Sequence, residues 1–352
     1  MVRKGLRWYA RLGWSSSSSR LITTMVEVRC GFGYKCLLHS VCPVPYRPAM
    51  AAAVVTDAAS PLEGVLGGRV HILNRLSGGA FAEIYLAKER DSHRLLVVKA
   101  IRRQVFEHFR RRRQSRLSIY DEYINLCSLL HPNIITACGA MTLPRHVAIC
   151  MEHIPGLSLF ERAFAGMCDE SLMVSATCGL VAALAYIHSR SLAHRDIKPE
   201  NVMTPLCNLD AVTVKLIDFG LAHTCTMQDG CRTLCGTYVY TAPEIRRGLP
   251  YGYAVDLWAL GVLVYACISG ELPACSGSHT EGMNAEAVLD DEFSCGRVLS
   301  VTSRCFVSQL VRVSPSSRST AAAAKSHPWL LGSSHSPQWL PDQCVGTQSS
   351  SK

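Results

Sequence analysis

The chain has 352 residues, of which 48 % are hydrophobic, and this proportion excludes a wholly disordered protein. Its longest apolar run, Trp258 to Ile268, is shorter than the about 20 residues that a membrane-spanning helix needs, so we expect no membrane span. The formal net charge is +9, but the first 50 residues carry eight basic residues and one acid. The rest is therefore nearly neutral, which argues against a nucleic-acid partner.

The first 68 residues show no sustained periodicity and are predicted to be a basic, disordered leader. Their arginines, the serine run Ser15 to Ser19 and the scarcity of acids are also typical of an organelle transit peptide. The 17 cysteines show no metal-ligand spacing, so we interpret them as mostly reduced intracellular thiols. Cytoplasm is the expected location, with mitochondrial or nuclear targeting as alternatives.

The next part of the chain is rich in strand signals. Residues 70–76 and 84–87 flank a Ser/Gly turn, and residues 95–101 form a further β-rich run. A helix is expected over 119–130 and another strand over 147–151. These patterns predict a lobe that is mostly sheet with one helix.

The second part is mostly helical. Leu180, Leu184 and Ile187 recur at helical spacing, and residues 255–268 are apolar nearly all round, which predicts a buried helix. A short Ala-rich helix is expected at 320–325, and residues 331–352 are predicted to be a disordered tail. The fold class is therefore α+β, with a β-rich lobe, an α-rich lobe and a cleft between them.

Two motifs in the second part carry chemistry. His194-Arg195-Asp196-Ile197-Lys198-Pro199-Glu200-Asn201 is followed by Asp218-Phe219-Gly220. Phosphoryl transfer needs a carboxylate near the incoming hydroxyl, oxygen ligands for Mg²⁺ and cations against the phosphates. Asp196 suits the hydroxyl, Asn201 and Asp218 the metal, and Lys198 the γ-phosphate.

On these two motifs the chain resembles the eukaryotic protein kinases, over roughly residues 70–330. The resemblance implies the two-lobed kinase fold over 69–330, with an N-lobe over about 69–154 and a C-lobe over about 155–330. It also implies ATP and Mg²⁺ as cofactors and proteins as substrates. Lys99 resembles the third-strand lysine that holds the α- and β-phosphates, and Glu122 its helix partner in an ion pair.

The nucleotide pocket departs from the family pattern. The stretch Leu76-Ser77-Gly78-Gly79-Ala80-Phe81-Ala82-Glu83-Ile84 keeps only one of the three usual glycines, with Ser77 and Ala82 in place of the others. A Cβ restricts how the backbone approaches phosphate, so we expect weaker or slower nucleotide handling, but not its loss. By resemblance, the adenine slot has Ile84 and Val97 as roof, Met203 as floor, Met151 as gatekeeper and Glu152 to Ile154 as hinge.

The activation segment is expected to run from Asp218 to Glu244. Thr233 stands where related kinases are phosphorylated, which implies an upstream activating kinase, and Arg195 is the expected partner of that phosphate. Thr237 matches the threonine that contacts the catalytic Asp and Lys, and with Lys198 it indicates Ser/Thr specificity.

Further matches concern the scaffold and the subgroup. Asp256 is expected to brace the catalytic loop, and Arg318 to pair with Glu244. His327-Pro328-Trp329-Leu330 resembles the end of the domain in the calcium/calmodulin-dependent kinase group. The run Arg110 to Arg113 is interpreted as a solvated basic loop; a dock for an acidic partner, a nuclear-import patch and phosphorylation of Ser115 remain open.

The predicted function is therefore a Ser/Thr protein kinase that is regulated through its activation segment. The altered glycine-rich loop and the narrowed slot at Val97 leave one alternative, a catalytically weak pseudokinase that acts as a binding scaffold.

Overall fold

A computed structural model describes residues 25–29, 35–39, 70–79, 81–112, 118–205, 214–225, 230–272 and 299–332. In the predicted leader it describes the backbone of β1 (Met25–Arg29) and β2 (Lys35–His39), which pair antiparallel. The rest of the leader, Ser115 and residues 333–352 of the predicted tail lie outside the described residues.

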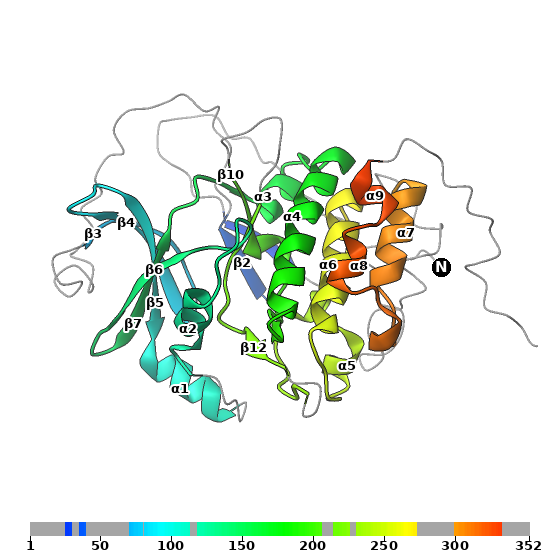
Figure 1. The fold of residues 1–352 in the computed structure, drawn as a ribbon. Coiled ribbons are helices and arrows are strands. Elements are labelled where there is room, and N and C mark those ends of the chain that lie inside the picture. Colours follow the sequence, from blue (N-terminus) through cyan, green and yellow to red (C-terminus); the bar gives the residue numbers. More distant parts are fainter. Residues whose placement is uncertain are drawn as a thin grey trace, which may run out of the picture.

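The first lobe is built on a five-stranded antiparallel sheet in the order β3-β4-β5-β7-β6 (Figure 1). Its strands are β3 (Val70–Gly78), β4 (Ala82–Glu89), β5 (Leu95–Arg102), β6 (Ala137–Thr142) and β7 (His146–Glu152). In β5, Leu96, Val98 and Ala100 are buried on one face of the sheet. Because side chains alternate along a strand, Val97 and Lys99 project from the opposite face.

Two helices accompany this sheet, α1 (Arg103–Arg112) and α2 (Asp121–Cys127). The interpretation of Arg110 to Arg113 as a loop is wrong for Arg110, Arg111 and Arg112, which form the last turn of α1. Cations favour this end of a helix because carbonyl groups without helical partners are exposed there. Arg110 also contacts Glu107 one turn earlier, with Nη2 and Oε2 2.8 Å apart.

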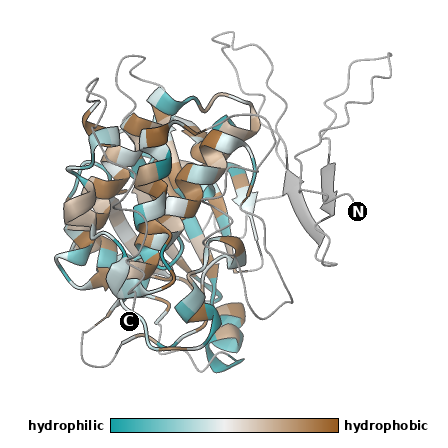
Figure 2. Cartoon of the chain, turned by 90° about the vertical axis from the view of Figure 1, so that its right-hand side faces the viewer, coloured by the Kyte–Doolittle hydropathy of each residue, from teal (hydrophilic) through white to brown (hydrophobic). Residues whose placement is uncertain are grey.

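The second lobe is mainly helical and lies to the right of the sheet in Figure 1. Its helices are α3 (Leu159–Phe164), α4 (Glu170–His188), α5 (Pro243–Arg246), α6 (Ala254–Ser269), α7 (Val301–Leu310), α8 (Ala321–Ala324) and α9 (Pro328–Leu331). The predicted α4 face, Leu180, Leu184 and Ile187, is fully buried. Figure 2 shows hydrophobic stretches along the packed helices of this lobe.

Short strands lie near the catalytic motifs. β8 (Gly156–Ser158), β10 (Val202–Pro205) and β11 (Lys215–Leu216) form one small sheet in the order β11-β10-β8. β9 (Leu192–Ala193) pairs with β12 (His223–Thr224). The His194–Asn201 loop leaves β9, and Asp218 follows β11, so the two pairs hold both motifs in place. The predicted α+β two-lobed architecture is confirmed.

Among the described residues, α4 has the length and the apolar composition of a membrane-crossing helix. It packs against α6, α8 and α9, and half of its most apolar window is buried. Core helices of globular domains share these properties.

Close packing of α6 on α7 predicts the effect of one substitution. A Cβ added at Gly261 would lie 2.6 Å from Val311 Cγ2 and 3.0 Å from Leu310 Cβ. We expect Gly261→Ala to lower the free energy of unfolding by about 1–2 kcal/mol, because overpacking outweighs the better helix propensity of Ala. Chemical denaturation measures this change. Gly252→Ala is the control, since its Cβ would meet no atom within 4 Å; equal stability of the two variants would contradict the prediction.

Candidate active site

A buried carboxylate on α6 braces the loop that carries the first motif. Asp256 Oδ2 accepts a hydrogen bond from the His194 N–H at 2.9 Å, and Oδ1 accepts one from the Arg195 N–H at 2.8 Å. His188 Nε2 lies 2.9 Å from Oδ2. Burial alone would raise the pKa of Asp256, but these contacts outweigh it and hold the pKa below its usual value. The carboxylate therefore stays charged and holds the loop backbone.

Two motif residues adopt a left-handed backbone conformation. The φ angles of Arg195 and Asp218 are 68° and 61°, in a region that side chains with a Cβ seldom adopt. At Asp218 the side chain supports this conformation, because Oδ1 accepts a hydrogen bond from the Gly220 N–H at 3.3 Å. Such conformations recur at functional sites, where the surrounding structure holds them.

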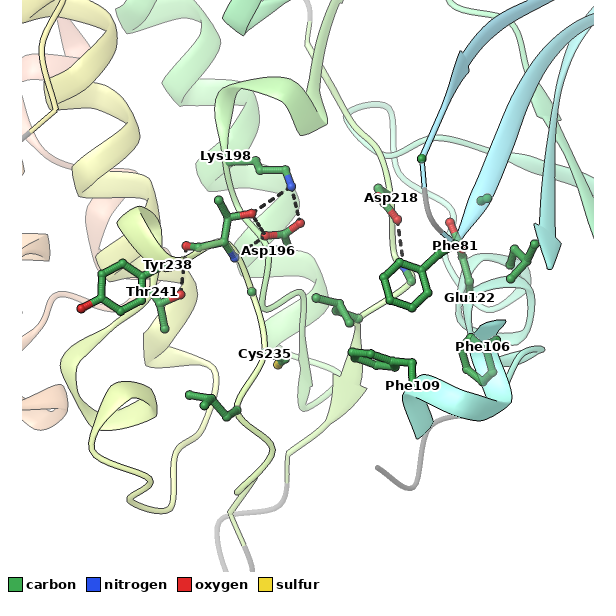
Figure 3. Close-up of a pocket in the computed structure, with 18 of the residues that line it drawn as sticks. Phe81, Phe106, Phe109, Glu122, Asp196, Lys198, Asp218, Cys235, Tyr238 and Thr241 are labelled. Carbon is green, nitrogen blue, oxygen red and sulfur yellow. Dashed lines mark hydrogen bonds and ion pairs between the residues drawn. The ribbon is translucent and has the colours of Figure 1, made fainter. Parts of the chain in front are cut away.

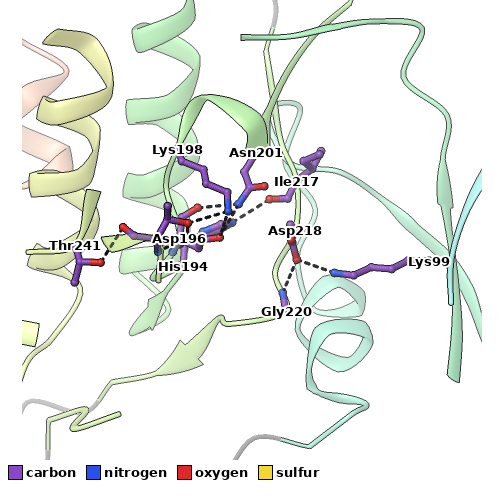
Figure 4. Close-up of polar contacts among 10 residues, drawn as sticks. Lys99, His194, Asp196, Lys198, Asn201, Ile217, Asp218, Gly220 and Thr241 are labelled. Carbon is purple, nitrogen blue, oxygen red and sulfur yellow. Dashed lines mark hydrogen bonds and ion pairs between the residues drawn. The ribbon is translucent and has the colours of Figure 1, made fainter. Parts of the chain in front are cut away.

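Asp196 lies at the centre of a polar cluster (Figure 4). Its Oδ1 accepts hydrogen bonds from the N–H and the Oγ1 of Thr237, at 2.9 and 2.8 Å. Lys198 Nζ lies 2.7 Å from Asp196 Oδ2 and donates to Thr237 Oγ1 at 2.9 Å. Asn201 Nδ2 donates to the Asp196 carbonyl at 2.9 Å. The loop, the activation segment and the residues before β10 thus meet at one carboxylate.

A second cluster joins the two lobes. Lys99 Nζ lies 2.7 Å from Glu122 Oε2 and 2.7 Å from Asp218 Oδ1. The ion pair expected between Lys99 and Glu122 is therefore present, and Figure 4 shows Lys99 extending toward Asp218. The side chains of Lys99 and Glu122 are 13 % and 4 % exposed, whereas that of Asp218 is 43 % exposed.

The charges of this cluster support one another. Burial alone would lower the pKa of Lys99, but Asp218 and Glu122 hold it above its usual value. Burial alone would raise the pKa of Asp218, but Lys99 holds it well below the usual range. For Glu122 burial prevails and raises the pKa, although Lys99 opposes this shift. Lys99 is thus a cation and Asp218 an anion at neutral pH.

A cavity of about 930 Å³ lies between the lobes and connects the two clusters. Predicted site residues that line it are Gly79, Ala82, Ile84, Lys99, Glu122, Asp196, Lys198, Asp218 and Thr237. Figure 3 shows Phe81, Phe106 and Phe109 on one side of this cavity and Asp196, Lys198 and Tyr238 on the other. The three phenylalanines were not predicted; the i, i+3 spacing of Phe106 and Phe109 on α1 is the one signal that could have indicated a shared face.

The glycine-rich turn closes on itself and on α1. The Gly79 N–H donates to the Ala82 carbonyl at 2.9 Å, and Ser77 pairs with Ile84 across β3 and β4. Phe81, at the tip, contacts the ring of Phe109 edge to face, with centroids 5.0 Å apart. The hairpin that was expected from Leu76 to Ile84 is therefore formed, with Leu76, Ser77 and Gly78 on β3.

The residues assigned to the adenine slot do not line this cavity, apart from Ile84. Val97 on β5 pairs with Met151 on β7, and Met203 lies on β10. Glu152 Oε1 accepts from Lys215 Nζ and from the Thr136 N–H, at 2.7 and 2.8 Å. No described residue accepts a hydrogen bond from the N–H of Ile154, which was expected to belong to the hinge.

The predicted regulatory residues lie close together but use other partners. Arg195 is buried; its Nε donates to the Leu221 carbonyl at 2.6 Å and its Nη1 to Tyr251 Oη at 3.2 Å. Tyr251 Oη in turn donates to the Thr233 carbonyl at 2.6 Å. Burial raises the pKa of Tyr251 above its usual value, so the phenol keeps its proton. Tyr251 was not predicted, because it stands outside the motifs.

Comparison with known sequences agrees with this geometry. Residues 70–330 match the family described as protein kinase domain. Calcium/calmodulin-dependent protein kinase type 1B of Homo sapiens is 32 % identical over 74 % of this chain and 75 % of that protein. Type IV of Mus musculus is 29 % identical over 76 % of this chain and 56 % of the relative. Serine/threonine-protein kinase RAD53 of Saccharomyces cerevisiae is 30 % identical over 80 % of this chain and 35 % of the relative.

The family match covers most of the chain and coincides with the two lobes. Protein kinases generally use ATP and Mg²⁺ and act on proteins. The pseudokinase alternative is not favoured, because the relatives are named as kinases and the charged residues of the two clusters are all in place. The chain belongs to the protein kinase family, as a serine/threonine kinase of the calcium/calmodulin-dependent kinase group.

Proposed function

We propose that Asp196 orients the serine or threonine hydroxyl of a protein substrate and accepts its proton as the γ-phosphate of ATP is transferred. One observation carries this assignment: Asp196 lines the same cavity as Lys99 and Asp218, across from them. Thr237 and Lys198 contact the two carboxylate oxygens, and these contacts orient the group. Positioning a base in this way is worth about 10²–10⁴-fold in rate.

Residues in and beside the cavity suit a metal–nucleotide: Asp218 lines it, and Asn201 is buried beside Asp196, outside the lining. The side-chain amide nitrogen of Asn201 donates to Asp196, at 2.9 Å from the carbonyl oxygen and 3.2 Å from Oδ2. The side-chain oxygen of Asn201 therefore remains available as a metal ligand. Asp218 supplies a charged oxygen that is partly exposed to the cavity. Mg²⁺ prefers such hard oxygen ligands, and when bound it neutralises the charge that develops on the phosphates. Lys99 holds the α- and β-phosphates, and Lys198 the γ-phosphate.

The nucleotide base is proposed to lie beyond this cavity, against the hinge. The backbone N–H of Ile154 has no described acceptor and is free to bind the base. Val97 and Met203 are proposed to cover the two faces of the ring. The proposed nucleotide contacts comprise Leu76, Ser77, Gly78, Gly79, Ala82, Ile84, Val97, Met151, Glu152, Ile154 and Met203. Ser77, Ala82 and Val97 add carbon atoms that the family pattern lacks, so a modest affinity for ATP is part of the proposal.

Phosphorylation of Thr233 by an upstream kinase inside the cell is proposed as the regulatory step. A phosphate on Thr233 adds a charge of about −1.5 to −2. Arg195 is the residue that the family resemblance implies as the partner of this phosphate. The guanidinium of Arg195 already donates to Leu221 and Tyr251, so this pairing requires an exchange of hydrogen bonds. Tyr251 links Arg195 to the Thr233 backbone and is therefore part of the proposed regulatory site.

The proposed function is tested with ATP labelled on the γ-phosphate and a generic protein substrate. Label is expected on serine and threonine in the presence of Mg²⁺ and not after chelation by EDTA. In parallel, Mg·ATP is expected to raise the melting temperature, since a ligand at 100 times its Kd stabilises by about 2.7 kcal/mol. Binding without transfer would support the scaffold alternative and contradict the assignment of Asp196, and transfer that survives chelation would contradict the metal site.

A further inference from the structure

Two cysteines of the activation segment form a disulfide. Cys225 and Cys231 are six residues apart, and their Cα atoms are separated by 5.8 Å. Both are buried, with 3 % and 6 % of their surfaces exposed. Other described cysteines, including Cys235 and Cys305, carry free thiols. The expectation that the cysteines are mostly reduced therefore does not hold for this pair. Cys231 lies two residues before Thr233.

Each cysteine is fastened to the body of the second lobe through its backbone. The Cys225 N–H donates to the Ser191 carbonyl at 2.8 Å, next to β9. Cys231 and Tyr251 exchange two backbone hydrogen bonds, at 2.7 and 2.9 Å. The disulfide therefore joins two fixed points, one beside the catalytic loop and one beside Tyr251.

From Cys231 the chain leads directly to the catalytic carboxylate. The Thr233 carbonyl accepts from Tyr251 Oη, and Thr237 donates to Asp196. Between them, Gly236 has a φ of 91°, and a Cβ there would lie 2.6 Å from the Arg195 carbonyl. The stretch from Cys231 to Thr237 is thus held against the catalytic loop, and its attachment at Cys231 limits how far it can depart.

Cys225 is accessible to small molecules despite its burial. A cavity of about 750 Å³, separate from the nucleotide cavity, is lined by Cys225, Gly230, Arg232 and Tyr251. A peroxide can reach Cys225 through it. Disulfides inside cells are usually transient and serve redox chemistry, so a pair in this position indicates a reversible modification.

We propose that Cys225 and Cys231 are a redox modification site at which peroxide closes the disulfide and thereby holds the activation segment in the arrangement that keeps Thr237 on Asp196. One thiolate attacks the peroxide O–O bond, which yields a sulfenic acid and one water; the second thiol displaces the hydroxyl as another water and forms the S–S bond. The two sulfurs together lose two electrons and two protons. A cellular dithiol reverses the step by thiol–disulfide exchange.

In this proposal the disulfide holds the activation segment against the catalytic loop, which a phosphate on Thr233 would otherwise do. Arg195 is occupied by Leu221 and Tyr251 in the disulfide-bonded structure, while the clusters around Asp196 and Lys99 are complete. The modification itself does not depend on the kinase function; only its effect on phosphoryl transfer rests on the proposed function.

The modification is tested on the full chain, first reduced and then exposed to low concentrations of hydrogen peroxide. Trypsin cleaves after Lys215 and Arg232, so both cysteines fall in one peptide, residues 216–232. This peptide is expected to become lighter by two hydrogen atoms and to regain them in dithiothreitol. Cys231→Ser should abolish the change, and Cys305→Ser, at an exposed site on α7, should preserve it. Free thiols at 225 and 231 when Cys305 is already oxidised, or pairing of Cys231 with Cys235, would overturn the proposal.

The fastening role has its own readout, cleavage of the native protein after the exposed Arg232. A cross-link that closes a short loop restricts local unfolding, so oxidation should slow this cleavage about tenfold. The Thr233→Ala variant cannot be phosphorylated at this position. It should therefore catalyse phosphoryl transfer when the disulfide is formed and lose this activity when the disulfide is reduced. Equal cleavage rates in the two redox states would refute the fastening role. Protection without transfer in either state would leave the modification standing and contradict the proposed function instead.

Discussion

Asp196→Asn is expected to lower kcat for protein phosphorylation by about 10²–10⁴-fold while the protein stays folded. The amide preserves the size of the side chain but cannot accept the proton of the incoming hydroxyl. It also removes the charge that holds Lys198 Nζ at 2.7 Å. The KM for ATP should change little, because Lys99 and Asp218 lie in the other cluster. Initial rates over a range of Mg·ATP concentrations separate kcat from KM.

The matched control is Asp91→Asn, which removes an equal charge from an exposed turn. This variant should keep the kcat of the wild type. If Asp196→Asn matched it, Asp196 would not be the residue that faces the substrate. A fall in thermal stability of Asp196→Asn alone would show that the carboxylate mainly holds the loop together, so melting curves of both variants accompany the kinetics.

The candidate site was predictable where its chemistry depends on local spacing. Asp196 and Asn201 are five positions apart, and a short loop that ends in η1 (Pro199–Asn201) brings both to one place. Lys99 and Glu122 are remote from them, and only the family resemblance connected the two pairs. The alternation observed in β5 places Lys99 on the face opposite the buried Val98, but it does not determine which carboxylate Lys99 meets.

The contacts that escaped prediction join elements that no local pattern relates. α1 was missed because its arginines dominate the composition and obscure the spacing of Phe106 and Phe109. Tyr251 contacts Arg195 and Thr233 from beyond the end of the activation segment. The pairing of Cys225 with Cys231 follows from the way β12 and Tyr251 fix the two ends of that loop. Such contacts depend on tertiary packing, which a single sequence does not encode in any short window.

A buried ion pair at the end of the activation segment leads to the largest expected loss of stability. Arg318 Nη1 lies 2.6 Å from Glu244 Oε1, and Nη2 donates to Oε2 at 2.7 Å. The two side chains are 0 % and 5 % exposed. Arg318 also donates to the carbonyls of Arg312 and Ala254. One guanidinium therefore joins α5, the start of α6 and the loop before α8.

Arg318→Met is expected to lower the free energy of unfolding by about 3–5 kcal/mol, because it leaves the Glu244 carboxylate buried without a counter-charge. Arg110→Met is the matched control: its ion pair with Glu107 is 42 % and 44 % exposed, and such a pair contributes at most about 1 kcal/mol. Adding Glu244→Gln to Arg318→Met should recover part of the loss, since the unpaired charge is then gone. Urea denaturation of the four proteins measures these differences. If Arg318→Met cost no more than Arg110→Met, the pair would contribute no more than a surface contact, and the end of the activation segment would be held by the packing of α5 and α6 alone.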